Sequence, residues 1–518
     1  MSLARNVATV GSATLLSRLL GFVRDIGIAA LLGAGALSDA YLAALQIPNL
    51  FRRLLSEGAL NSAFVPMWLR KSQDAGPEGA RRFGAEVLGA MLVILGVIAI
   101  LCVVFAPTLV RLLAPGFDAA GERHALAVTY VRISVLYIVI AGVVAVWAAI
   151  LNAAGRVGAV AFGVVIFNCV FVVVVIVLIV SGAAATPRTG AILSGAVALS
   201  GIGQILLIGV ALFALPDALR RPSFALSTDT RRFFALALPG IVAAGVPQLK
   251  LMAGAVVASS SQNAVSWLYY AYRLYELPLG IVSIAIATVL VPLIAASVRA
   301  GKAEAFTAAQ SRGFEIALGL ALPAAIALAV LAEPIVHVLF ERGAFGAQDT
   351  AAVAAALAAI SAGLPGHALE KVLGAVSFAH EDTRTPMLAA LAGLVTAVVA
   401  AVLLFPLYGH VGIAAAIAVS GWVGALILAI LLGRRGWLGI DPQAQQRLVR
   451  IVLGAILMGI AIFVAQHVLV APLAASTLAR TAMLGALVGG GLAVYLALLH
   501  AFGVMRLREL ALAIRKGI

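Results

Sequence analysis

Long apolar runs alternate with short polar segments along almost the whole chain. About 20 apolar residues in a helix cross the hydrocarbon core of a bilayer, which is about 30 Å thick. Runs of at least that length recur throughout the sequence. The pattern predicts an all-α integral membrane protein with about 14 transmembrane helices. We place the spans at residues 8–32, 38–68, 83–106, 126–151, 158–181, 190–214, 233–258, 266–297, 312–332, 350–378, 385–405, 411–433, 448–471 and 480–502.

The charges in the loops favour an even number of spans. With the N-terminus in the cytoplasm, most of the 35 basic residues fall in cytoplasmic loops, as the positive-inside rule requires. The outer loops hold Arg111, Arg123, Arg188, Arg342 and Arg480. We therefore expect both termini in the cytoplasm. The sidedness rule leaves a set of basic residues within the spans unexplained, namely Arg18, Arg24, Arg52, Arg53, Arg132, Lys250, Arg273 and Lys371.

The chain resembles itself with a period of about 220 residues. The segment "AFVPMWLRK" at 63–71 is similar to "TVLVPLIAAS" at 288–297, and "AVALSG" at 196–201 is similar to "AIAVSG" at 416–421. An even number of spans in each copy gives a parallel repeat, as in many transporters. We predict a six-helix lobe at 1–215, a second six-helix lobe at 216–435, and a further helix pair with a basic tail at 436–518.

Charged side chains within the spans mark the candidate site. Each costs roughly 2.5–3.5 kcal/mol at the centre of a membrane helix, so it usually faces a wet cavity or a charged partner. In the first span Ser17 and Arg24 share a helix face. Asn49 and Arg52 lie on one stripe of the second span, and Arg273 lies in "SWLYYAYRLYELPLG" of the eighth.

Internal salt bridges that brace the helices are the alternative. Arg53 and Glu57 are four residues apart, Arg18 and Asp25 share a face, and Arg273 and Glu276 are three residues apart. Pairing explains Arg24 poorly, because the next residue, Asp25, projects about 100° away around the helix. Arg24, Arg52 and Arg273 are therefore our strongest ligand candidates, and Arg132 is expected to extend to the membrane surface.

Arginines in a membrane cavity indicate an anionic substrate. The guanidinium group makes bidentate contacts with phosphate oxygens and stays charged at any pH. The residues alone thus predict a carrier for a phosphate-bearing substrate. Lys250, Glu276, Glu370 and Lys371 are candidates for coupling or gating.

Composition excludes other classes of protein. Apolar types make up 63% of the chain and charged types 11%, against roughly 25% charged in soluble proteins. The sidedness rule explains much of the net charge of +14, so we expect no nucleic-acid partner. The sequence contains no phosphate-binding GxxxxGK[ST] loop and no metal-ligand spacing among its 7 His, so we expect neither a cofactor nor a metal. Cys102 and Cys169 lie in apolar runs and are not expected to form a disulfide.

Several segments resemble the MurJ (MviN) family of lipid II flippases, which belongs to the multidrug/oligosaccharidyl-lipid/polysaccharide exporter superfamily. They are "LSRLLGFVRD" at 16–25, "GAGALSDAYLAALQIPNLFRRLLSEGALNSAFVP" at 33–66, "APGF" at 114–117, "ILNAAGR" at 150–156 and "VSWLYYAYRLYELPLG" at 265–280. The likeness extends over nearly the whole chain, and the segment from 16 to 66 is the most specific part.

The resemblance implies a transporter rather than an enzyme. It implies that the protein moves lipid II from the cytoplasmic to the outer leaflet of the bacterial inner membrane by alternating access, with a cationic central cavity for the head group and a groove on the last helix pair for the lipid tail. The family's essential arginines correspond to Arg18, Arg24, Arg52 and Arg273, and its acidic neighbours to Asp25 and Asp39. Cell-wall synthesis proteins are the partners it suggests.

Two features depart from the family pattern. Tyr272 stands where relatives often carry an acidic residue before the arginine of the eighth span. The stretches that correspond to a sodium site of the family contain Lys250, Glu370 and Lys371, so the resemblance does not carry that site to this chain.

Two other functions remain open from the residues alone. A flippase for another polyprenyl-pyrophosphate-linked glycan needs the same cationic cavity. A membrane enzyme acting on polyprenyl phosphates needs clustered carboxylates, for which Glu381 and Asp382 are the nearest candidates. A scaffold for cell-wall assembly would not require charged residues within the spans.

Overall fold

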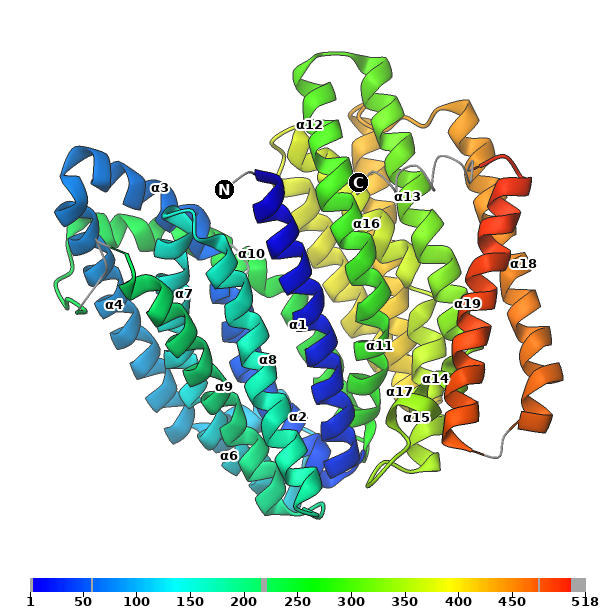
Figure 1. The fold of residues 1–518 in the computed structure, drawn as a ribbon, viewed down its shortest axis with the longest axis horizontal. Helices are drawn as coiled ribbons and strands as arrows, with labels where there is room; N and C mark the ends of the chain where they lie inside the picture. Colours follow the sequence, from blue (N-terminus) through cyan, green and yellow to red (C-terminus); the bar gives the residue numbers. More distant parts are fainter. Residues whose placement is uncertain (1–2, 57–58, 216–220, 474–475, 505–518) are drawn as a thin grey trace. The chain divides into compact units, whose positions relative to one another are not determined.

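The fold is helical throughout the residues that the computed structural model describes, which are 3–56, 59–215, 221–473 and 476–504. By their internal contacts the residues form two compact units. Unit 1 comprises Met1–Ser266 with Arg342–Gly346, and unit 2 comprises Trp267–Glu341 with Ala347–Ile518. Figure 1 shows the chain from blue at its N-terminus to red at its C-terminus.

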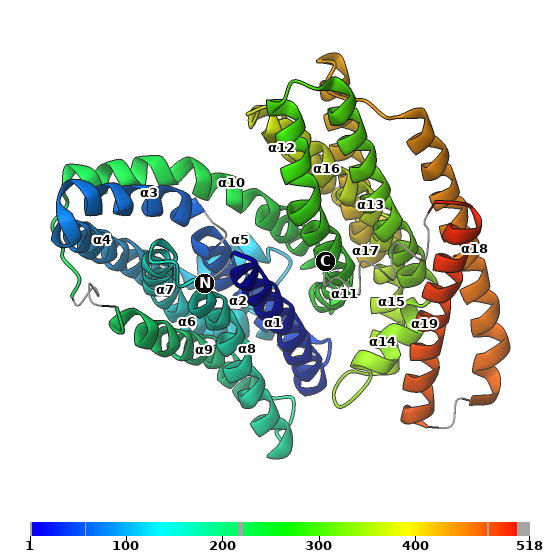
Figure 2. The same cartoon turned by 45° about the horizontal axis from the view of Figure 1, so that its top comes forward.

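The helices of unit 1 follow one another with short connections. They are α1 (Leu3–Leu32), α2 (Ala36–Ser56), α3 (Ala59–Asp74), α4 (Gly76–Val104), α5 (Ala106–Leu113), α6 (Glu122–Ser134), α7 (Leu136–Ala153), α8 (Val157–Val180), α9 (Pro187–Phe213) and α10 (Thr228–Ala258). Helix α8 packs between α1 and α9, and α7 packs against α4 and α9. Helix α10 lies along α3, as Figure 2 shows.

Unit 2 contains the remaining helices. They are α11 (Ala264–Ala285), whose first residues belong to unit 1, the π-helical turn η1 (Ile286–Leu290), α12 (Val291–Arg299), α13 (Ala303–Val330), α14 (Ala332–Phe340), α15 (Ala347–Ser361), α16 (Leu364–Ala379), α17 (Arg384–Arg434), α18 (Pro442–Leu473) and α19 (Thr477–Ala501). Helix α17 has 51 residues but breaks at Gly409, whose φ of 56° interrupts the helix between the two predicted spans. Helix α16 packs on α17, and α13 packs on α18.

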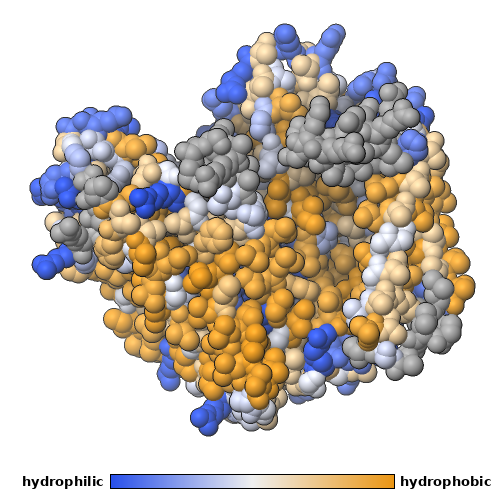
Figure 3. Space-filling view, in the orientation of Figure 1, coloured by the Kyte–Doolittle hydropathy of each residue, from blue (hydrophilic) through white to orange (hydrophobic). Residues whose placement is uncertain are grey.

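The helices are long and apolar enough for a membrane protein. Nine helical segments in the described residues meet this test, or ten if the bent pair α15 and α16 is one span. Large apolar side chains also cover their outer faces: Leu206 and Val210 of α9 are 64% and 73% exposed. Figure 3 shows apolar side chains over the middle of the helices in view and hydrophilic side chains near their ends. Such surfaces are stable in lipid and unstable in water.

The all-α membrane fold is therefore confirmed, whereas the count of 14 spans stays a prediction. Helices α1, α2 and α10, which fall on predicted spans, are not among the segments that meet the test. Helix α2 carries Asp39 and Arg52, which lower its mean hydropathy. The predicted span 38–68 falls on helices α2 and α3, and Glu57 and Gly58 between them lie outside the described residues.

A polar cluster at the end of α14 and the starts of α15 and α19 holds these helices together. The Glu341 carboxylate accepts hydrogen bonds from Thr350 at 2.6 Å and from His337 at 2.7 Å, and Arg480 of α19 contacts His337. Partial burial alone would raise the pKa of Glu341. The hydrogen bonds and the charges of His337 and Arg480 outweigh this effect, so the pKa lies below its ordinary value. The net lowering keeps Glu341 ionised at neutral pH and stabilises this end of the unit.

Glycines allow close helix packing in unit 1. A Cβ at Gly201 of α9 would lie 2.6 Å from Ile140 and 2.8 Å from Tyr137 of α7, whereas a Cβ at Gly195 would meet only Ile133 at 3.8 Å. We predict that Gly201→Ala lowers the free energy of unfolding by about 1–3 kcal/mol, because the added methyl overpacks the interface. Gly195→Ala on the same helix is the control. Melting temperatures in detergent measure both, and equal values would contradict the packing argument.

Candidate functional site

Arg24 lies at the centre of a polar cluster between α1 and α8 in unit 1. Its Nε and Nη2 donate to Oδ1 of Asp25 at 3.0 and 2.9 Å, and its Nη1 donates to Oδ1 of Asn168 at 3.3 Å. Its guanidinium carbon lies 5.3 Å from the centroid of the Phe171 ring. The Arg24 side chain is 19% exposed and that of Asp25 is fully buried. The charge is thus balanced but remains accessible.

Asn168 extends this cluster along α1. Its Nδ2 donates to the hydroxyl and the carbonyl oxygen of Ser17 at 3.0 and 3.1 Å. Ser17 and Arg24 therefore share a face, as predicted, with one asparagine bridging them. Sequence reasoning missed Asn168, whose only signal was an amide within the apolar run of α8.

We expected the Arg24 side chain to point away from Asp25, and this prediction is wrong. The backbone positions do project about 100° apart, but the long arginine side chain folds back to its neighbour. Arg18, the partner that we considered for Asp25, is exposed on α1. The direction of the Cβ atom was a poor guide because four further torsions separate it from the guanidinium.

Arg52 and Asn49 of α2 are half-buried side chains in the same unit. The charge of Arg52 acts on the buried hydroxyl of Tyr137 in α7, which packs against α2. Nearby, Asn152 of α7 donates to Asn61 of α3 at 3.4 Å. Glu57, the predicted partner of Arg53, lies outside the described residues.

Asp39 binds the first turn of α11. The carboxylate is fully buried and accepts backbone hydrogen bonds from Asn263 and Ser266, both at 2.9 Å, and a third from the Ser266 hydroxyl. A helix N-terminus has unpaired N–H groups and a partial positive charge, so a carboxylate stabilises it. Asp39 therefore fixes the start of the helix that carries Arg273.

Arg123 completes the surroundings of Asp39. Its Nη1 lies 3.7 Å from the carboxylate and donates to the carbonyl oxygen of Ser261 at 3.3 Å. Its guanidinium carbon lies 4.8 Å from the centroid of the Phe117 ring. The sequence offered Arg123 only as one of the few basic residues of the outer loops, and nothing linked it to Asp39.

Arg273 of unit 2 forms the pair with Glu276 that we considered as the alternative to a ligand role. Its Nη1 donates to Oε2 of Glu276 at 2.8 Å, and the two side chains are 25% and 23% exposed. The next residue but one, Tyr275, is buried and hydrogen-bonds to His367 of α16 at 2.7 Å. Of the coupling candidates, Glu370 is half-buried and Lys371 exposed on α16, and Lys250 is half-buried on α10 of unit 1.

The site contains charged and hydrogen-bonding groups but no metal centre. Among the described residues, no three His, Cys, Asp or Glu side chains lie close enough to hold a metal ion. Guanidinium groups suit an anion, and the carboxylates of Asp25 and Glu276 hold those of Arg24 and Arg273 in place.

Solved structures define the class of fold, that of an all-α multi-pass membrane protein. A structure entitled "Lipid II flippase MurJ, inward closed conformation" superposes with a TM-score of 0.79 at 23% identity, covering 95% of this chain and 98% of that one. An inward-facing multidrug resistance MATE family transporter of the MOP superfamily superposes with a TM-score of 0.67 at 18% identity, covering 81% and 94%.

Sequence comparison defines the family. The "Probable lipid II flippase MurJ" of Rhizobium meliloti (strain 1021) is 39% identical over 522 residues, covering 100% of this chain and 97% of the relative. The "Lipid II flippase MurJ" of Burkholderia cenocepacia is 30% identical, covering 88% and 89%. Residues 28–483 match the family described as "Lipid II flippase MurJ". The chain belongs to the lipid II flippase MurJ family.

We predict that Asp39→Asn lowers the free energy of unfolding by about 1.5–3 kcal/mol, because charge-assisted hydrogen bonds to the first turn of α11 are lost. The effect should shrink in an Arg123→Gln background, since the two charges interact. Asp118→Asn is the control, because that exposed carboxylate only accepts a bond from Ala120. Thermal unfolding in detergent measures all four variants, and additive effects would contradict the Asp39–Arg123 coupling.

Proposed function

We propose that this protein flips lipid II from the cytoplasmic to the outer leaflet by alternating access. Membership of the lipid II flippase MurJ family over residues 28–483 is the observation that carries the proposal. The 39% identity across the full chain supports the same substrate. Lipid II carries a pyrophosphate, and the partly exposed Arg24 and Arg273 suit such a group.

The pyrophosphate binds to arginines in a cationic central cavity. In this proposal Arg24, Arg52 and Arg273 bind phosphate oxygens, and Arg18 and Asn49 contact the head group. Asp25 positions the Arg24 guanidinium and Asp39 positions α11. The proposal draws on the charge of these groups and on the 19% and 25% exposure of Arg24 and Arg273. Lys250, Glu276, Glu370 and Lys371 take part in coupling or gating.

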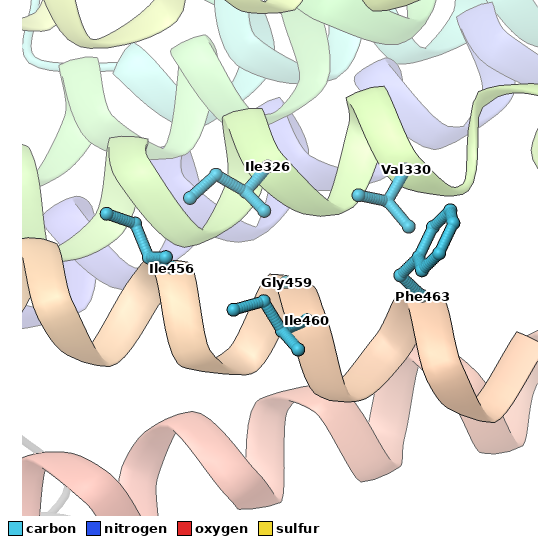
Figure 4. A pocket seen from close by; sticks show the side chains of 6 residues that line it. All are labelled: Ile326, Val330, Ile456, Gly459, Ile460 and Phe463. Atoms are coloured by element: carbon cyan, nitrogen blue, oxygen red, sulfur yellow. The ribbon is translucent and has the colours of Figure 1, made fainter.

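The lipid tail binds along the C-terminal helix pair. An apolar cavity of about 290 Å³ lies between α13 and α18, lined by Ile326, Val330, Ile456, Gly459, Ile460 and Phe463. Figure 4 shows Ile326 and Val330 of α13 facing the α18 residues across it. A polyprenyl chain has no polar atoms, so this lining suits it.

The proposed function also implies where in the cell the protein lies. We place the protein in the bacterial inner membrane with both termini cytoplasmic, because the basic residues gather in alternate loops. Its lobes are residues 1–215 and 216–435, followed by the helix pair at 436–518. Cell-wall synthesis proteins are the partners that a supplier of peptidoglycan precursor requires.

We predict that Arg24→Ala and Arg273→Ala each abolish flipping while the protein remains inserted, because the pyrophosphate loses a guanidinium partner. Arg132→Ala is the control, since that arginine is exposed and donates to the carbonyl oxygen of Val103. Growth of a flippase-depleted strain and lipid II accessibility at the outer face of vesicles measure the effect. Wild-type flipping by either variant at normal protein levels would refute the ligand role.

We predict that Ile460→Trp slows the flipping of lipid II, because the indole fills the apolar cavity that we assign to the tail. Ile460 is 54% exposed, so the larger side chain is tolerated. Val488→Trp on α19 is the control, since Val488 is 48% exposed and does not line the cavity. A short-chain lipid II analogue should be flipped at the same rate by both variants. Equal slowing of long and short substrates by Ile460→Trp would exclude the tail assignment.

A further inference from the structure

Unit 2 contains a titratable group that the proposed transport cycle does not use. His367 lies in the first turn of α16, half-buried, with its Nδ1 2.7 Å from the hydroxyl oxygen of Tyr275 in α11. Tyr275 is only 1% exposed. Ionisable side chains inside membrane helices are costly, and they commonly mark ion or proton pathways.

The Nδ1 atom of His367 has two partners, and its role toward them changes with its protonation state. It lies 3.0 Å from the carbonyl oxygen of Gly363 and 2.7 Å from the Tyr275 hydroxyl. An unprotonated Nδ1 accepts a hydrogen bond from the hydroxyl, whereas a protonated Nδ1 donates to the carbonyl oxygen or to the hydroxyl oxygen. Protonation of Nδ1 therefore either reverses the hydrogen bond between α16 and α11 or replaces it with one within α16.

Glu370 faces α17 next to His367. A Cβ at Gly421 would lie 2.4 Å from His367 Nδ1, and a Cβ at Gly424 would lie 3.0 Å from the Glu370 carboxyl carbon. These two glycines thus leave the space in which an imidazole and a carboxylate lie between two apolar helices. The imidazole and the carboxylate are three residues apart on α16, so they lie about one helical turn from each other.

The hydrogen bond between His367 and Tyr275 lies close in sequence to Arg273 on α11. Glu370 of α16 and Glu276 of α11 both act electrostatically on the Tyr275 hydroxyl. Tyr275 directly precedes Glu276, which holds Arg273 at 2.8 Å. A change in the Tyr275 hydrogen bond therefore occurs one residue from the carboxylate that positions a substrate ligand.

Further charged and titratable residues lie on the helices around His367. Helix α13, which also packs on α16, carries Glu315 in pairs with Arg312 and Arg447. The other charged or titratable residues on the helices around His367 are Lys371 on α16, Arg299 on α12, Glu304 on α13, Arg384, Tyr408, His410 and Arg434 on α17, and Tyr269, Tyr270 and Tyr272 on α11.

We propose that His367, with Tyr275 and Glu370, forms a proton-binding site that couples proton movement to the transport step. The imidazole takes one proton from water on one side of the membrane and returns it to water on the other. A single imidazole beside a single carboxylate suits a proton better than a metal ion, which needs more ligands. The inference rests on the proposed flippase function.

The test uses the full protein in liposomes that contain fluorescent lipid II. Lipid II in the outer leaflet is measured with no gradient, with a pH gradient of one unit of either sign, and with a membrane potential alone. One coupled proton per cycle lets a gradient of one pH unit shift the leaflet distribution by up to about tenfold. Gradients of opposite sign should shift the wild-type distribution in opposite directions.

His367→Gln should lose the response to pH gradients while it still flips lipid II without a gradient. His467→Gln is the matched control and should keep the full response. That histidine is exposed on α18 and contacts the carbonyl oxygen of Phe463 in the same helix. Tyr275→Phe keeps the imidazole and should weaken the response, which tests the site even where His367→Gln does not fold.

The outcomes separate the two proposals. No flipping by the wild-type protein above empty liposomes would overturn the flippase function. Wild-type flipping that ignores the pH gradient, or a full pH response in both His367→Gln and Tyr275→Phe, would overturn the proton site and leave the flippase function intact.

Discussion

A charge inside a membrane must have a partner, and this requirement shapes both units. A lone charged side chain at mid-membrane costs several kcal/mol, so each one is stable only beside an opposite charge or a hydrogen-bonding group. Arg24 has Asp25, Arg273 has Glu276, and Asp39 has Arg123 and the first turn of α11. Two of these groups also connect or order helices: Arg24 bonds to Asn168 of α8, and Asp39 fixes the start of α11. The residues suited to bind a phosphate group are therefore also residues that stabilise the fold.

Hydropathy predicts the class of fold because a span must be apolar along its whole length, a property that sequence shows directly. The partners of the polar residues are less predictable, since they depend on side-chain torsions and on helices far apart in the chain. The sequence offered Glu276 as an alternative partner of Arg273 because three residues separate them on one helix. Asn168 and Arg123 were missed because their partners, Ser17 and Asp39, lie on other helices. The clusters within each unit were thus only partly predictable.

Small residues make the polar networks sterically feasible. Helices α16 and α17 approach closely at Gly363 and Gly366, where an added Cβ would meet Ala418 and Trp422 of α17 at 3.0 Å or less. The same interface leaves room at Gly421 and Gly424 for polar side chains of α16. Close backbone contact gives van der Waals stabilisation that lipid cannot replace. This stabilisation offsets the free-energy cost of burying the polar groups between the helices.

The pairing of the arginines bears on how a membrane potential acts during transport. Arg24 and Arg273 are each balanced by a carboxylate in this structure. A pyrophosphate that binds to them adds negative charge to pairs that are already neutral, because the carboxylates remain in the protein. In the proposed cycle these two pairs therefore leave the charge of the substrate uncompensated, and an inside-negative potential favours the outward step by about 2.3 kcal/mol per uncompensated charge per 100 mV. An unpaired cationic carrier would place that driving force on the return step instead.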